Sequence, residues 1–232
     1  MILANYSEPS IIKIGLFYGG QKISIKANVP DGYEVITKIK GPDETLHLKK
    51  KGKVWGILWM NVKEISYNFV PKLYIIRSSS KIASIAPINI LQPLEIGYES
   101  LKEKTTNEQE PETKELFGEL IKLKESEGLF SINNESFKCT SLQNGMRQAV
   151  TEFMLPPKAP VGEYIVELFA FSNGSGSRIE TSTFKLEQAP SINFLSSLAF
   201  NHGFLFGCLA VIIAILAGLL SGIIFGGSGK GH

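Results

Sequence analysis

The C-terminal part of the chain contains a long apolar stretch that limits what the whole molecule can be. No Asp, Glu, Lys or Arg occurs between Gln188 and Gly229, and the residues from Phe204 to Phe225 are almost all apolar. A helix of this length rises about 33 Å, enough to cross a bilayer hydrocarbon core of about 30 Å. The alternative is a helix buried in a soluble core, but such a helix usually keeps a polar face. The stretch therefore predicts one transmembrane helix, with the preceding domain tethered to a lipid bilayer.

Small residues recur every four positions along this predicted helix. They are Ala210, Ala214, Gly218, Gly222 and Gly226, which form one slowly drifting stripe. In lipid, small residues let two helix backbones approach closely, so the stripe predicts packing against another membrane protein or a second copy of this chain. The alternative is that Gly and Ala are simply common in membrane spans.

Charge and cysteine content exclude several classes of protein. The 232-residue chain has a formal net charge of only +2, whereas a phosphate-binding surface normally needs a clustered basic excess. Lys49, Lys50, Lys51 and Lys53 do cluster, and we interpret them as a solvated edge beside a turn. We therefore expect no nucleic-acid partner. One of the two cysteines lies inside the predicted span, so no disulfide framework is expected.

The ends of the chain bear on topology. The first residues do not resemble a signal peptide, because no basic leader precedes an apolar run. Either a cleaved leader is missing and the domain is exported, or the protein is tail-anchored with its domain in the cytoplasm. Lys230 follows the span closely, while the nearest preceding basic residue is Lys185. The positive-inside rule therefore favours a cytoplasmic C-terminus.

Alternating apolar runs separated by turn signals predict β-strands in the first part of the chain. They cover Ile11–Tyr18, Lys22–Val29, Tyr33–Lys40, Thr45–Leu48, Val54–Val62 and Pro71–Arg77. The glycine pair at Gly19-Gly20 predicts that the first two strands form a β-hairpin. Strands at this spacing favour an antiparallel β-sandwich.

Strand patterns return near the end of the soluble part. They cover Leu129–Ile132, Phe137–Thr140, Gln148–Leu155, Glu163–Ser172 and Arg178–Glu187, the last two as a hairpin. The run from Pro160 to Tyr164 is like the corner of immunoglobulin-like folds, in which a tyrosine hydroxyl bonds back to a turn. The expected fold class is mainly β, with antiparallel immunoglobulin-like β-sandwich lobes, one amphipathic helix and a C-terminal transmembrane helix.

A charged segment separates the two strand-rich regions. Its first half has almost no apolar content and predicts a mobile loop. Its second half, Glu112–Glu125, predicts an amphipathic helix on the sandwich; the alternative is a docking helix for a partner. The apolar residues at helical spacing are Leu116, Phe117, Leu120, Ile121 and Leu123. The predicted division is a β lobe over 1–98, a linker and helix over 99–127, a second lobe over 128–190, an interfacial segment over 191–203, the span over 204–225 and a tail over 226–232.

No set of residues predicts catalysis, a cofactor or a metal site. The three histidines lie far apart and no Cys-x-x-Cys occurs. Ser175 lies in a predicted hairpin, whereas a nucleophile elbow needs a strand-to-helix turn. We therefore expect the protein not to be an enzyme.

The most distinctive soluble stretch is Val54–Val62, which holds both tryptophans of the chain. If it is a strand, Trp55, Trp59 and Asn61 share one face. One interpretation places the tryptophans in the core, and the other makes this face an aromatic binding surface.

Several short motifs resemble a family of bacterial transmembrane proteins first grouped in alphaproteobacteria. They are Lys40-Gly41-Pro42, Lys49-Lys50-Lys51, Gly56–Asn61, Val70–Tyr74, Leu155-Pro156, Pro160–Tyr164 and the terminal span. Together they cover most of residues 11–225. The resemblance implies a signal peptide, which this sequence does not show, and an exported β-rich domain with a C-terminal anchor. Some relatives are encoded beside permeases that resemble sulfite or sulfonate exporters, and the family has no established catalytic residues to carry over.

Two functions follow from these observations. The leading hypothesis is a membrane-anchored accessory or assembly subunit in a bacterial cytoplasmic membrane, with its domain on the periplasmic side and an integral membrane partner such as a transporter. The alternative is an exported ligand-binding or sensory module that uses the aromatic surface.

Overall fold

The computed structural model describes residues 3–6, 10–15, 18–54, 58–106, 111–142, 145–190 and 199–226. The chain divides into two compact units. The first, which we call the head, comprises Met1–Ile12 and Tyr18–Glu187, and the second comprises Lys13–Phe17 and Gln188–His232. Each unit is described by itself.

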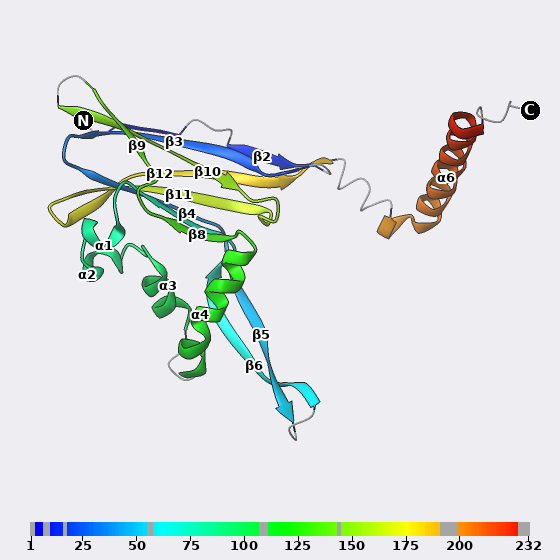
Figure 1. The fold of residues 1–232 in the computed structure, drawn as a ribbon, viewed down its shortest axis with the longest axis horizontal. Helices are drawn as coiled ribbons and strands as arrows, with labels where there is room; N and C mark the ends of the chain where they lie inside the picture. Colours follow the sequence, from blue (N-terminus) through cyan, green and yellow to red (C-terminus); the bar gives the residue numbers. More distant parts are fainter. Residues whose placement is uncertain are drawn as a thin grey trace, which may run out of the picture. The chain divides into compact units, whose positions relative to one another are not determined.

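The head is built mainly from antiparallel strands (Figure 1). A four-stranded sheet has the order β1 (Leu3–Tyr6), β3 (Gln21–Pro30), β10 (Met146–Leu155), β9 (Lys138–Ser141). A six-stranded sheet has the order β2 (Ile11–Ile14), β12 (Ser175–Gln188), β11 (Gly162–Ser172), β4 (Glu34–Lys40), β7 (Tyr74–Ser78), β8 (Phe130–Asn133). Strands β7 and β8 run parallel. The fold is therefore mainly β and rich in antiparallel pairs, as predicted.

The burial patterns distinguish the two sheets. In β3 the buried residues alternate, Ile23, Ile25, Ala27 and Val29, so one face lies in the core and the other faces outward. In β7, by contrast, every residue is buried. The centre of the six-stranded sheet is therefore covered on both faces, by the four-stranded sheet on one and by helices on the other.

The covering layer consists of four helices that lie together on one side of the six-stranded sheet (Figure 1). They are α1 (Ile82–Ile85), α2 (Ile88–Leu91), α3 (Tyr98–Thr105) and α4 (Pro111–Ser126). Helix α4 confirms the predicted amphipathic helix to within one residue at each end, and it buries Phe117, Leu120 and Ile121.

The predicted apolar face of α4 is wrong at one position. Leu123 is 43% exposed, whereas Lys124 is buried and its Nζ lies 2.8 Å from Glu44 Oε1. An ion pair to the neighbouring strand thus accounts for a buried lysine that the apolar pattern cannot predict.

The mobile loop predicted before α4 is also wrong in part, because α3 occupies Tyr98–Thr105. Leu101 and Thr105 are buried there, and the Thr105 hydroxyl donates a hydrogen bond to the Leu101 carbonyl at 2.9 Å. These few buried side chains are enough to hold the short helix α3 in the helical layer of the head.

The hairpin predicted around Gly19-Gly20 is wrong, because β2 and β3 belong to different sheets. Gly20 has a φ of 103°, and a Cβ there would lie 2.7 Å from the Leu155 carbonyl oxygen. The glycine therefore allows the chain to pass close to β10 as it enters the four-stranded sheet.

Strands from the two predicted lobes interleave in both sheets. Strand β3 pairs with β10, and β4 pairs with β11. The segments 1–98 and 128–190 thus build one head rather than two separate bodies. The antiparallel β11–β12 hairpin forms as predicted.

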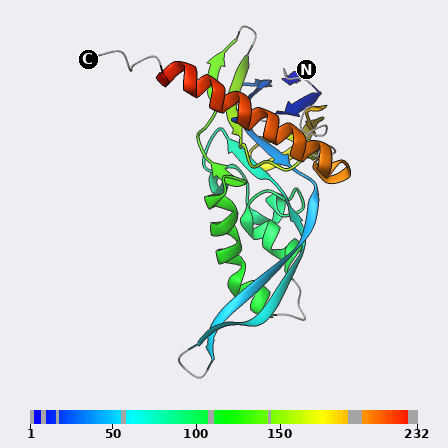
Figure 2. The ribbon, with the colours of Figure 1, turned by 90° about the vertical axis from the view of Figure 1, so that its right-hand side faces the viewer.

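Strands β5 (Asp43–Val54) and β6 (Leu58–Pro71) form a separate two-stranded hairpin. The sequence predicted shorter strands, with Val54–Val62 as one of them, but β5 ends at Val54 and β6 begins at Leu58. At its base the Tyr67 hydroxyl donates a hydrogen bond to the Thr113 carbonyl of α4 at 3.0 Å. The rest of the hairpin extends away from the sheets (Figure 2).

The predicted tyrosine corner is confirmed. Tyr164, at the start of β11, is fully buried and its hydroxyl donates a hydrogen bond to the Pro160 carbonyl. Its ring stacks on Phe184 with centroids 5.0 Å apart and an interplanar angle of 7°. The corner therefore joins the turn before β11 to the β11–β12 hairpin.

Replacing Tyr164 by Phe should lower the free energy of unfolding of the head by about 1 kcal/mol, because the Pro160 carbonyl loses its buried donor. Urea unfolding of the full chain in detergent, followed by circular dichroism, measures this. Tyr18→Phe is the matched control, since the buried Tyr18 hydroxyl has no hydrogen-bond partner among the described residues. If Tyr164→Phe and Tyr18→Phe lower the free energy of unfolding equally, the hydrogen bond of the tyrosine corner has no special role in stability.

Candidate functional site

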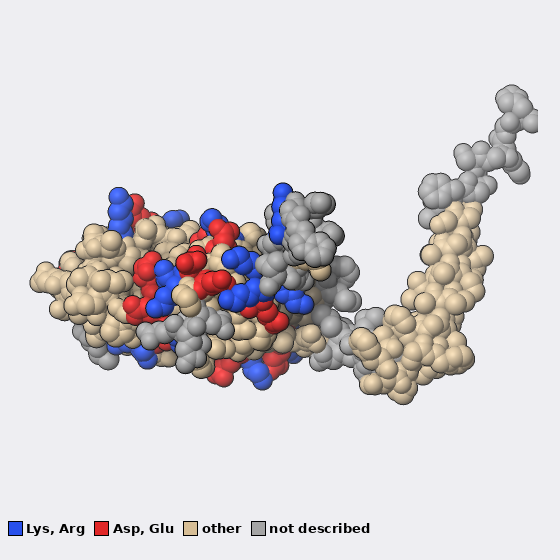
Figure 3. Space-filling view, turned by 90° about the horizontal axis from the view of Figure 1, so that it is seen from below, with Lys and Arg blue, Asp and Glu red and all other residues tan. Residues whose placement is uncertain are grey.

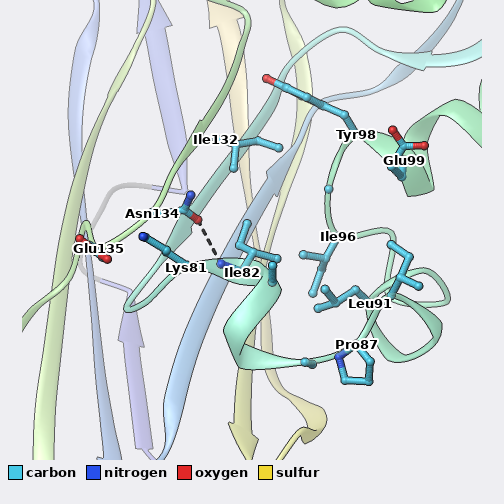
Figure 4. A pocket seen from close by; sticks show the side chains of 14 residues that line it. Lys81, Ile82, Pro87, Leu91, Ile96, Tyr98, Glu99, Ile132, Asn134 and Glu135 are labelled. Carbon is cyan, nitrogen blue, oxygen red and sulfur yellow. Dashed lines mark hydrogen bonds between the residues drawn. The ribbon is translucent and has the colours of Figure 1, made fainter.

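A pocket of about 610 Å³ lies in the helical layer of the head (Figure 4). Three segments form it: α1 and α2, the residues 96–99, and the end of β8 with the turn after it. Its apolar lining includes Ile82, Ala83, Ala86, Pro87, Ile88, Leu91, Ile96, Tyr98 and Ile132. The volume and the apolar lining are those of small-molecule sites in proteins.

The lining of the pocket has a buried inner part and an exposed outer part. Ile96 and Leu91 are only 1% and 4% exposed, whereas Ile88 is 55% exposed. The Asn134 Oδ1 accepts hydrogen bonds from the Ile82 backbone N–H at 3.2 Å and from the Ser78 hydroxyl at 3.1 Å. This side chain therefore fixes the start of α1 against the end of β7.

The ionisable groups of the pocket do not converge. In Figure 4, Lys81 and Glu135 lie on one side of the apolar lining, and Tyr98 and Glu99 lie on the other. The Tyr98 hydroxyl donates to Glu125 Oε1 at 2.7 Å, and burial together with this carboxylate raises the Tyr98 pKa. The arrangement suits binding of an apolar ligand better than acid–base chemistry.

Tyr74 of β7 positions the wall formed by residues 96–99. Its hydroxyl donates to the Glu95 carbonyl at 2.8 Å and accepts from the Gly97 N–H at 2.9 Å. Glu95 and Gly97 both have positive φ values, 52° and 99°, so the backbone winds tightly around this hydroxyl. Burial raises the pKa of Tyr74, which keeps the hydroxyl protonated and able to donate.

A buried ion pair lies under the same wall. Lys38 of β4 and Glu167 of β11 face each other across the sheet, with Lys38 Nζ 2.8 Å from Glu167 Oε2 and side chains only 3% and 10% exposed. Lys38 Nζ also donates to the Leu94 carbonyl at 2.6 Å. Burial lowers the pKa of Lys38, while the hydrogen bond and charge of Glu167 act to raise it. The pair thus ties two central strands to the helical layer.

Further charges surround this pair. Glu95 lies 2.5 Å from Lys104 Nζ and 3.5 Å from Lys40 Nζ, measured from its carboxylate oxygens. Burial acts to raise the pKa of Glu95, but the hydrogen bond from Lys104 and the charges of Lys40 and Lys104 lower it overall. On the face of the head that Figure 3 shows, acidic and basic side chains are intermixed.

The C-terminal unit carries helix α6 (Gly203–Gly226). Its residues Gly203–Ile223 form one candidate membrane span, and none of that span is buried against the described chain. Helix α6 contains no Asp, Glu, Lys or Arg.

A comparison with protein families finds a match over almost the whole chain. A family model described as "Putative transmembrane protein (Alph_Pro_TM)" matches residues 2–226. The chain belongs to this family of transmembrane proteins. Neither the curated proteins nor the solved structures contain a match.

The predicted packing stripe lies on the span of this family member. Ala210, Ala214, Gly218, Gly222 and Gly226 all fall within α6. A Cβ added at Gly218 or Gly222 would meet no described atom within 4 Å outside the helix backbone. No described atom outside α6 therefore lies against these two glycines.

The predicted aromatic surface is not assembled by the described residues. Trp55 lies outside them. Trp59 and Asn61 belong to β6, opposite Lys53 and Lys51 in the register, but their side chains are not described.

The sequence patterns described above do not predict the pocket. One signal was present: Ile82, Ile85, Ile88 and Leu91 recur every three residues, with Pro87 between them. This spacing is typical of one apolar face on two short consecutive helices.

Replacing Lys38 by Met should lower the free energy of unfolding by about 3 kcal/mol, because Glu167 then loses its nearest buried counter-charge. The double variant Lys38→Met/Glu167→Leu should be more stable than that single variant, which a double-mutant cycle with urea unfolding measures. The exposed pair Lys22–Glu152, 2.6 Å apart, is the control, and its Lys22→Met variant should change the stability little. If the changes in unfolding free energy caused by Lys38→Met and Glu167→Leu simply add in the double variant, the two side chains are not energetically coupled.

Proposed function

We propose that this protein is a non-enzymatic, membrane-anchored accessory or assembly subunit. Helix α6 spans a bacterial cytoplasmic membrane, the head lies on the periplasmic side, and the C-terminus lies in the cytoplasm. The head acts beside an integral membrane partner such as a transporter. The tyrosine corner supports an immunoglobulin-like arrangement of its sandwich.

The observation that carries this proposal is the accessible stripe on α6. A helix that only anchors a domain has no need of an aligned small-residue face, because any apolar side chain satisfies the lipid. Gly218 and Gly222 expose the backbone on one side, where dispersion contacts with a second helix are closest. Lys230, after the span, supports the orientation.

Gly218→Leu/Gly222→Leu should remove helix–helix contact, because two isobutyl groups then separate the backbones. The tagged chain, purified in mild detergent from its native host, should lose its co-purifying membrane protein by at least tenfold in quantitative mass spectrometry. If the partner is a second copy, chemical cross-linking of the chain to itself should fall instead.

The control adds bulk to the opposite side of α6. Leu216→Phe/Leu220→Phe changes two residues that lie opposite Gly218 and Gly222 on a helical projection. It should leave co-purification and cross-linking intact. Unchanged assembly of the glycine variant would contradict the proposed role of the stripe.

A second candidate function is ligand binding in the head, and the apolar pocket favours it. The pocket has a buried apolar floor, an open outer part and separated polar groups, a combination suited to an uncharged apolar molecule. On this proposal the head senses or carries such a ligand beside the membrane.

Filling the pocket should abolish this binding. Ala83 lines the pocket and is exposed on α1, so Ala83→Trp adds an indole ring to the lining with little change to the core. A photoreactive alkyl diazirine should label the tryptic peptide Ile82–Lys102 of the wild-type chain in lipid nanodiscs, and this labelling should fall several-fold in the variant.

The matched control is Ser84→Trp, since Ser84 is exposed on the same helix but does not line the pocket. Its labelling should equal that of the wild type. Equal labelling of all three proteins would contradict ligand binding at this site.

A further inference from the structure

The β5–β6 hairpin carries a positive charge excess that the rest of the chain does not share. Residues 47–64 contain five lysines and one glutamate, a net charge of +4, while the whole chain has +2. The remaining residues therefore sum to −2. Lys49, Lys50 and Lys63 are all exposed. The charge of the head is thus strongly asymmetric.

The register places two of these lysines directly opposite each other. Lys50 of β5 pairs with Lys63 of β6, an arrangement that is unfavourable by itself in an antiparallel pair. Glu112 of α4 lies 3.0 Å from Lys63 Nζ, and Glu64 lies 3.3 Å from His47 Nδ1. Within residues 47–64 one glutamate stands against five lysines, so this part of the hairpin has a net positive charge that an external anion can balance.

The outer part of the hairpin extends beyond the helices. An ion pair joins Lys63 of β6 to Glu112 of α4. Four more residues of β5 follow Lys50, which corresponds to about 13 Å at the rise of an extended strand. Figures 1 and 2 both show this part projecting away from the sheets. It can therefore touch a flat surface without obstruction from the head.

We propose that the lysine-rich hairpin docks on the anionic surface of the bilayer to which the chain is anchored. Clustered lysines close to a membrane are attracted by acidic lipid head groups within a Debye length. The residues that follow the lysines in the sequence include both tryptophans, a residue type enriched at membrane interfaces. The partner is thus an acidic lipid surface.

Because the chain is anchored in the membrane, even a weak contact is sufficient to hold the hairpin at the bilayer surface. Helix α6 and the hairpin belong to one chain, so docking is an intramolecular event at high effective concentration. A few lysines, which bind vesicles only weakly from solution, then hold the hairpin at the surface for a large fraction of the time. The inference uses only the predicted membrane anchor and does not require a protein partner or a pocket ligand.

The test uses Trp55 and Trp59, the two tryptophans of the chain, as reporters. The full chain is reconstituted in nanodiscs of phosphatidylcholine alone or rich in phosphatidylglycerol, each with lipids spin-labelled near the head group. Tryptophan fluorescence should be quenched at least twofold more strongly in the acidic nanodiscs, and high salt should remove this difference.

Lys49→Glu/Lys50→Glu should abolish the extra quenching. Lys50→Glu places an acid opposite Lys63, which favours the strand pairing, whereas Lys49→Glu places one opposite Glu64, which disfavours it, so the two effects on folding oppose each other. Lys26→Glu/Lys158→Glu makes the same change in net charge at exposed positions elsewhere on the head and should quench like the wild type. Circular dichroism checks that all three proteins are folded.

Equal quenching in neutral and acidic nanodiscs, or unchanged quenching in the hairpin variant, would overturn the proposal. One further outcome would also overturn the proposal. If the spin-labelled lipids do not quench the tryptophans, but an acidic protein shifts their emission in a salt-sensitive way, the lysines recognise a protein.

Discussion

The buried ion pair between Lys38 and Glu167 is the interaction on which the arrangement of the head depends. It lies between the central strands β4 and β11, on the face that the helical layer covers. Two charges removed from water are costly unless each is fully paired, so the helices must bring the partners that complete the set. The Leu94 carbonyl accepts from Lys38, and Arg178 lies 2.8 Å from Glu167. The contact with Lys38 therefore ties the segment after α2 to β4, while Arg178 of β12 supplies the second partner of Glu167.

The pocket follows from that placement. Leu94 is held by Lys38 and the next turn is held by the Tyr74 hydroxyl, so the backbone at Ile96 and Gly97 cannot move toward α1 and α2 to close the gap. On the opposite side Asn134 holds the start of α1. An apolar cavity stays open when polar contacts behind its walls hold the walls apart. This is why binding in the head is a reasonable second function, and why it would depend on charges that never touch the ligand.

The sequence could predict what local patterns determine. The β11–β12 hairpin, the Tyr164 corner and α4 each depend on residues close together in the chain, and each was predicted. Long-range pairing was not accessible: β2 has the composition of a hairpin partner for β3, yet it pairs with β12. From the alternating pattern of its strand, Lys38 is expected to face solvent. In the structure the helices cover it. The pocket was missed because its three walls come from separate segments. Lys49, Lys50 and Lys53 are exposed, as a solvated edge should be, but they lie within β5 rather than beside a turn.

Two attachments of very different strength would then hold the head at a membrane. Transferring α6 out of lipid exposes 18 hydrophobic side chains, so the anchor is permanent on any biological timescale. The hairpin gains only about 1 kcal/mol for each lysine near an acidic surface, and salt screens this gain. Docking is therefore reversible while anchoring is not, and the orientation of the head becomes sensitive to lipid composition. A head that tilts with the acidity of its own bilayer would present the pocket and the outer sheet differently to a membrane partner, which links the lysines to the accessory role without any catalytic group.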